Sequence, residues 1–274
     1  MRKLDIIAVI IALNLFIFLN RPYCVADELS TNNTTGAHQK LIWPKIENKA
    51  FKAGELLNYY VEFGPIKVGK AKLHVKEIVN FNGRNAYHII ACSESFPFFD
   101  IFYKVRNVDE SLTDVESFAS LKYEKHQRET NYIRDVVIVF DHINKKFYLT
   151  EKKGSKPEVK KEGEIPQFVT DVLSALYYVR TLQLKIGEEY FINSHSDEIS
   201  YPIKVIVWRK EKIETVCGKF DCIVIEPIVL PSAGLFKAKG RLWIWLTDDD
   251  YKIPVLMKSK LIIGSIVAEL QQLP

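Results

Sequence analysis

The chain has 274 residues, of which 47% are hydrophobic, and its formal net charge at neutral pH is +4. This length can bury a sizeable core without disulfides and fits one large domain or two small ones. So small a charge excess provides no extended basic surface for phosphates, which argues against nucleic acid as a partner.

The N-terminus has the layout of a secretory signal peptide. Two basic residues precede an apolar run over residues 6–19, which is shorter than the ~20 residues of a comfortable bilayer span. Small residues before Asp27 predict cleavage after Ala26, so residues 1–26 form the expected signal segment. Their removal takes away three basic side chains and one acidic side chain, and the formal charge falls from +4 to +2.

Two alternatives remain for this segment. The first is an uncleaved anchor. The protein would then contact a membrane through this segment alone. The second is a lipidated Cys24, against which Tyr23 counts, because a lipidation motif needs a small residue directly before the cysteine. In either case we expect the protein to be exported.

The expected mature chain begins with a polar stretch of low periodicity over residues 27–50, which predicts a flexible leader. From residue 51 to residue 274 we expect a single β-rich domain. Its first strands are predicted at 56–63 and 66–78. In the second strand, the apolar residues occupy even positions before Gly69 and odd positions after it. This change of phase predicts a β-bulge and hence a bent strand.

Further strands follow at regular spacing, as in an all-β barrel or sandwich. A charge-rich stretch over residues 152–164 interrupts them and predicts a mobile loop. The other predicted strands cover 85–94, 101–114, 120–130, 135–141, 146–152, 189–195, 203–215, 220–230, 239–249 and 253–270.

One helix is predicted among these strands, at about residues 171–182, because apolar residues there recur at helical spacing. Asp171 is suited to cap its first turn, and Arg180 lies in the last turn, where the helix dipole favours a cation. A lone helix must bury its apolar stripe against the sheet. The predicted fold is therefore mainly β, with a large curved antiparallel sheet, a half-barrel or barrel, wrapped around this helix.

Four landmarks give the chain a family resemblance: "FKAGELLNYYVEFGPIKVGKAKL", "DVLSALYYVR", "CGKFDCIVIEP" and "LWIWLTDDDYKIPV". In this order they resemble the domain of unknown function 3108 (DUF3108) of exported bacterial proteins, from about residue 51 to residue 270. The resemblance implies a β-rich fold and a place in the Gram-negative periplasm. It also implies a likeness to the half-barrels of lipoprotein carriers, which hold an acyl chain between a curved sheet and a helix. It supplies no catalytic residues.

Export bears on the cysteines, because disulfides persist outside the cytoplasm. The residues between Cys217 and Cys222 fit a four-residue hairpin connection, which predicts a disulfide between the two facing strand ends. Cys92 is the competing partner if this pair does not form.

Two aromatic stretches, at residues 96–103 and 242–246, are candidates for an apolar pocket. Both faces of the second are apolar, so that strand is either covered on both sides or lines a cavity. Core packing is the alternative for both. The expected pocket residues are Phe98, Phe102, Tyr177, Arg180, Trp243 and Trp245, and Arg180 also suits a purely structural partner on the sheet.

No catalytic, metal-binding or cofactor-binding motif occurs, so no catalytic residue, metal or cofactor is expected. Residues 248–250 are interpreted as a turn between strands rather than a calcium site, because the 12-residue loop pattern is absent. Residues 195–197, "HSD", are interpreted as a solvated turn rather than part of a triad.

The leading hypothesis is a non-enzymatic periplasmic protein that binds a lipid-like or amphipathic envelope component in a curved-sheet cavity. The second is a scaffold or interaction module in envelope assembly, whose partners would be envelope proteins. The third is a hydrolase of envelope polymers, for which the sequence shows no motif.

Overall fold

The computed structural model describes residues 41–230, 241–261 and 264–273. The predicted signal segment 1–26, with its cleavage point between Ala26 and Asp27, lies outside the described residues, as does the predicted leader up to residue 40. Within the described ranges, no helix combines the length and the apolar character needed to cross a membrane. The predicted domain boundaries therefore stay predictions.

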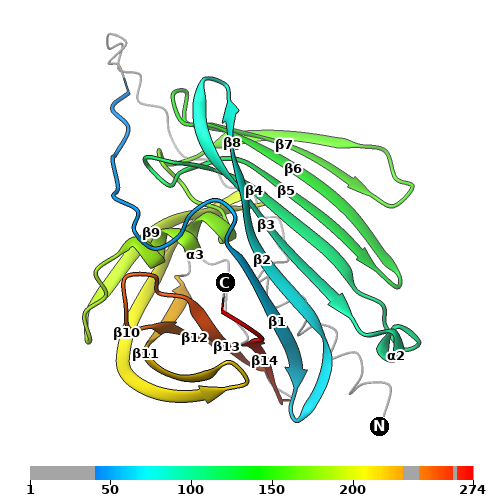
Figure 1. The fold of residues 1–274 in the computed structure, drawn as a ribbon. Helices are drawn as coiled ribbons and strands as arrows, with labels where there is room; N and C mark the ends of the chain where they lie inside the picture. Colours follow the sequence, from blue (N-terminus) through cyan, green and yellow to red (C-terminus); the bar gives the residue numbers. More distant parts are fainter. Residues whose placement is uncertain (1–40, 231–240, 262–263, 274) are drawn as a thin grey trace.

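The strands of the described chain form a fourteen-stranded sheet, in which every paired strand is antiparallel to its neighbour and β8 and β9 lie at the two ends (Figure 1). The sheet curves around one long helix, α3, and stays open, which confirms the predicted half-barrel. The strands are β1 (Leu56–Phe63), β2 (Ile66–Phe81), β3 (Arg84–Ser95), β4 (Arg106–Asp114), β5 (Ser120–Glu129), β6 (Tyr132–Asp141), β7 (Lys146–Lys153), β8 (Val159–Glu164), β9 (Glu189–Ser196), β10 (Ile199–Thr215), β11 (Gly218–Val229), β12 (Arg241–Thr247), β13 (Pro254–Leu261) and β14 (Gly264–Leu270).

The structure corrects three predicted elements. The charge-rich stretch predicted as a loop contains the edge strand β8, whose side chains are mostly exposed and therefore lack apolar alternation. The strand predicted over 101–114 begins only at Arg106, because Pro97 starts a short helix, α2 (Pro97–Asp100). The run predicted over 253–270 is two strands, β13 and β14.

The predicted β-bulge lies where the phase change placed it. Val61 of β1 pairs with Gly69, and the next residue, Glu62, pairs with Lys67, so Val68 is the extra residue. A bulge of this kind bends and twists its strand. A second register shift leaves Trp208 of β10 without an opposite residue in β11. Such irregularities curve the sheet around the helix.

Gly69 is also required by close packing, which gives the first prediction. A β-carbon added there would lie 2.2 Å from the backbone oxygen of Glu94 on β3. We expect Gly69→Ala to lower the free energy of unfolding by about 1–3 kcal/mol, since β3 would have to move. Urea denaturation measures this, with Lys70→Ala, at an exposed neighbour, as the control. Equal stabilities of the two variants would contradict the packing argument.

The long helix, α3 (Val172–Thr181), begins as predicted. The Asp171 carboxylate accepts hydrogen bonds from the backbone N–H groups of Leu173 and Ser174 at 2.8 and 2.9 Å. It also accepts from the hydroxyls of Ser111 and Ser120, both at 2.6 Å. One buried carboxylate thus caps the helix and ties it to β4 and β5.

The other end of α3 is held by a buried ion pair. The Arg180 guanidinium donates to both carboxylate oxygens of Glu55 at 2.6 and 2.8 Å, and to the backbone oxygens of Ala50 and Tyr251 at 3.1 Å each. Tyr177 packs one turn earlier, with its ring centroid 4.6 Å from that of Phe51. Arg180 therefore connects the helix to the start of β1 and to the β12–β13 turn.

The end of the predicted leader docks on the domain. The backbone N–H of Ile46 donates to the oxygen of Glu116 at 2.8 Å, and the Arg84 guanidinium lies 3.7 Å from the centroid of the Trp43 ring. Ala50 is buried. These contacts tie the end of the predicted leader to the domain, while Ile42 is 85% exposed.

The hairpin between β10 and β11 corrects the predicted disulfide. Thr215 pairs with Gly218, so the turn contains only Val216 and Cys217, while Cys222 lies on β11 opposite Glu211. With Cys217 in the turn, the two side chains do not face each other. Cys217, Cys222 and the competing Cys92 are all unpaired.

Candidate functional site

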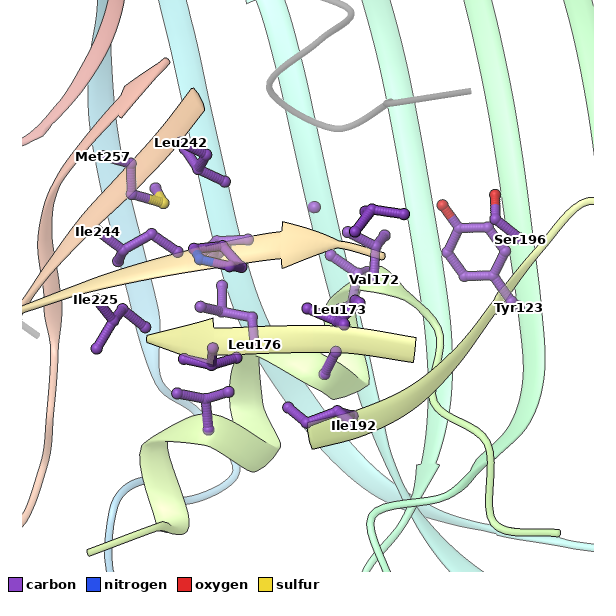
Figure 2. A pocket seen from close by; sticks show the side chains of 18 of the residues that line it. Tyr123, Val172, Leu173, Leu176, Ile192, Ser196, Ile225, Leu242, Ile244 and Met257 are labelled. Carbon is purple, nitrogen blue, oxygen red and sulfur yellow. The ribbon is translucent and has the colours of Figure 1, made fainter. Parts of the chain in front are cut away.

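A cavity of about 180 Å³ lies between α3 and the sheet. Strands β9–β13 of this sheet contribute part of its lining. Figure 2 shows its side chains converging from the helix and from several strands. Val172, at the start of α3, is one of its lining residues and is 38% exposed. The lining residues are Tyr59, Ala71, Lys72, Leu73, Ala91, Cys92, Tyr123, Val172, Leu173, Ala175, Leu176, Val179, Ile192, His195, Ser196, Tyr201, Ile203, Val205, Ile225, Pro227, Val229, Leu242, Ile244 and Met257.

Most of this lining is aliphatic, which determines what the cavity can hold. An apolar cavity of about 150 Å³ in another protein stays dry and takes up benzene. The present one is slightly larger, so it suits a short hydrocarbon segment or a single ring. A whole membrane lipid would have to leave most of its length outside.

One end of the cavity is polar. In Figure 2 the side chains of Tyr123 and Ser196, with their oxygens, are both drawn at the right of the view. The Tyr123 hydroxyl donates to Asp109 Oδ1 at 2.6 Å. His195 is held by Ser200 Oγ and by the backbone oxygen of Asp197, each at 2.9 Å. Burial lowers the pKa of His195 to about 4, so its imidazole is neutral at physiological pH.

Beyond this end lies a buried cluster of ionisable side chains. Arg134 donates to Glu151 at 2.5 Å and to Asp197 at 3.0 Å. Lys125 Nζ lies 3.9 Å from an oxygen of Asp197. Burial lowers the pKa of Lys125 to about 8 and raises the pKa of Asp109 to about 7. For both groups, desolvation outweighs the attraction of neighbouring opposite charges.

The cluster overturns one interpretation of the sequence. Asp197 and His195 are buried and paired rather than part of a solvated turn. The available signal was the alternation of polar residues in β4, where Asn107, Asp109 and Ser111 share one face, and that face is buried. Such a pattern resembles an exposed face, because sequence alone does not show that α3 and β9 cover it.

None of the six expected pocket residues lines the cavity. Phe98 and Phe102 are exposed on α2 and its C-terminal end, and Tyr177 and Arg180 are buried against Phe51 and Glu55. Trp245 is buried and Trp243 is half-buried, on the face of β12 opposite to the cavity.

The helix and the strand that carry four of these six residues contribute other side chains to the cavity. Leu176 and Val179 of α3, and Leu242 and Ile244 of β12, line the cavity. The aromatic side chains of the same elements point elsewhere, because α3 and β12 are each packed on more than one side.

The arrangement of acidic side chains bears on metal binding and on hydrolysis. Among the described residues, no group of three or more His, Cys, Asp or Glu side chains is arranged to hold a metal ion. The buried acids Asp171 and Asp197 are engaged with hydroxyls or with Arg134, whereas a hydrolytic pair of carboxylates would have to converge in a cleft.

Comparison with known proteins identifies the family of this chain. The family model of a protein of unknown function, DUF3108, matches residues 58–271. The chain belongs to the DUF3108 family. The match covers all fourteen strands except the first two residues of β1, and it includes α3 and the whole cavity lining.

Two solved structures match this DUF3108 protein to different degrees. A beta-barrel-like protein of DUF1849 from Brucella abortus is 10% identical, with a TM-score of 0.53, over 80% of this chain and 95% of that one. A putative exported protein with a YmcC-like fold from Bacteroides fragilis is 8% identical, with a TM-score of 0.29, over 85% and 100%. No curated protein matches the sequence. The first likeness shows the fold alone.

Proposed function

We propose that this DUF3108 protein is a non-enzymatic protein of the periplasm that binds the apolar part of a lipid-like envelope component. The observation that carries the proposal is the aliphatic cavity between α3 and the concave face of the sheet. A void lined by aliphatic side chains lacks the dispersion contacts of a filled core, and this loss destabilises the empty protein. A hydrocarbon segment restores those contacts.

The size of the cavity gives a quantitative prediction for binding. Each buried CH₂ contributes about 0.8 kcal/mol, which corresponds to a roughly fourfold gain in affinity. We expect the affinity for n-alkanols from pentanol to dodecanol to rise by this factor per carbon and then to level off once the cavity is full. Isothermal titration calorimetry measures both the slope and the length at which it ends.

A cavity-filling variant locates the binding site. Ala175 is buried and lines the cavity, so Ala175→Phe is expected to weaken alkanol binding at least tenfold. Phe191→Trp is the matched control, because Phe191 is exposed on β9 beside the cavity residue Ile192. Native mass spectrometry of the protein from its own envelope then identifies any co-purifying lipid. Absence of alkanol binding, together with no bound lipid, would overturn the proposal.

A second candidate function, that of an interaction module in envelope assembly, is favoured by an exposed apolar patch. Phe98, Ile101 and Phe102 are 65%, 78% and 52% exposed at one tip of the sheet. A partner with an apolar surface would bury them. A photo-crosslinking residue at Phe98 is expected to capture a discrete envelope protein in cells if this function holds. The same residue at the exposed Phe191 is the control.

A further inference from the structure

Two buried polar atoms in the concave part of the sheet lack a hydrogen-bond partner among the described residues. They are Asp109 Oδ2 and Ser93 Oγ, and their residues are 0% and 5% exposed. A buried polar group without a partner costs about 1–3 kcal/mol. Because nearly all buried polar groups in folded proteins have a hydrogen-bond partner, the lack of a partner at these two atoms requires an explanation.

Neither residue lines the cavity itself, but each is paired in the sheet with a residue that does: Asp109 with Ala91, and Ser93 with Ala71. In the sheet register, Ala91 of β3 pairs with Asp109 of β4, and Ser93 pairs with Asn107. Residues two apart on a strand share a face, so Ser93 and Asp109 lie on the face of Ala91, diagonally across β3 and β4. Ala91 lines the cavity, and so does Tyr123, whose hydroxyl donates to the other oxygen of Asp109.

The surroundings of these atoms favour one chemistry. The concave side buries more acidic side chains than basic ones: Asp109, Glu129, Glu151, Asp171 and Asp197 against Lys125 and Arg134. Lys72 is also a lining residue, but it lies between Ala71 and Leu73 on β2, so its side chain belongs to the opposite face of the sheet. Arg134 is engaged by Glu151 and Asp197. An oxygen acceptor and a hydroxyl within an electronegative region suit a group that donates hydrogen bonds, and they repel a further anion.

We infer that Asp109 and Ser93 form a polar subsite for the head group of an amphipathic ligand, and that this head group is an amine or a hydroxyl rather than a phosphate or carboxylate. This inference rests on the proposed function, because the tail of the same ligand occupies the cavity. The donor group would satisfy Asp109 Oδ2 and Ser93 Oγ as the hydrocarbon fills the space beside Ala91 and Tyr123.

Three ligands of equal length test the subsite. n-Nonylamine, n-nonanol and nonanoate are titrated into the full-length protein at neutral pH by calorimetry, below their aggregation concentrations. We expect the amine to bind at least tenfold more tightly than nonanoate, with the alcohol between them. Asp109→Asn is expected to reduce the ratio of amine to nonanoate affinity at least tenfold, and Ser93→Ala to weaken alcohol binding severalfold.

Controls separate the subsite from the cavity. Asp221→Asn changes an exposed carboxylate, with 69% of its side chain accessible, and is expected to leave the affinity ratio unchanged. If all three ligands bind equally while affinity still rises with chain length, the subsite is wrong and the proposed function stands. Tightest binding of nonanoate would also overturn the subsite. If no ligand of any length binds, the proposed function itself fails. Ser93→Ala provides the test should Asp109→Asn not fold.

Discussion

Arg180→Met is expected to lower the free energy of unfolding by about 3–5 kcal/mol. Arg180 is 1% exposed, and its guanidinium donates to both oxygens of Glu55. Without it, the Glu55 carboxylate stays in a buried position with no counter-charge, and the oxygens of Ala50 and Tyr251 lose a donor. Methionine retains much of the side-chain volume, so the loss reports on charge and hydrogen bonding rather than on a void. Chemical denaturation measures it.

The double variant Glu55→Leu/Arg180→Leu distinguishes this cause from lost packing. When both charges of a buried pair are replaced by apolar groups, no uncompensated charge remains, and the change is often close to neutral. The double variant is therefore expected to be more stable than Arg180→Met. A double variant less stable than Arg180→Met would show that the pair is net stabilising and that its geometry holds α3 in place.

The elements predicted correctly from sequence are those whose signal is local. Asp171 indicates a helix start through its capping chemistry, and Gly69 indicates a bend because a phase change within a strand requires an extra residue. The prediction for the Cys217 hairpin was wrong because its register is set by the whole strand pair. "GKFD" fits a loop, yet Lys219 and Phe220 are paired with β10.

The site was less predictable than the fold for a related reason. Aromatic side chains were predicted to line the pocket, but those of α3 and β12 pack on sides of these elements that face away from the cavity. The aliphatic residues between them line the cavity. The polar end is assembled by Asp109 and Lys125 from adjacent strands and by Asp197 from the distant β9–β10 turn. A contact across more than seventy residues leaves no trace in local periodicity.

Asp109→Asn is expected to make the protein more resistant to rising pH. In the unfolded chain this carboxyl has its ordinary pKa of 3.8, whereas burial raises its pKa to about 7 in the folded protein. Between these values the folded state holds a proton that the unfolded state has released, so Asp109 reduces stability as pH rises from 3.8 to 7. The full shift of about three units corresponds to about 4 kcal/mol as an upper estimate.

The pH dependence of the unfolding free energy of the wild-type protein does not isolate this effect by itself, because the pKa of His195 is lowered from 6.5 to about 4. The folded state binds fewer protons there, so His195 makes stability rise with pH over much of the same window. The difference in unfolding free energy between Asp109→Asn and wild type removes the His195 contribution, and we expect it to grow steadily in favour of the variant from pH 4.5 to pH 7.5. Lys125, with a pKa of about 8, stays mostly charged over this range. A difference independent of pH would mean that the Asp109 carboxyl titrates alike in both states, and that burial does not control its charge.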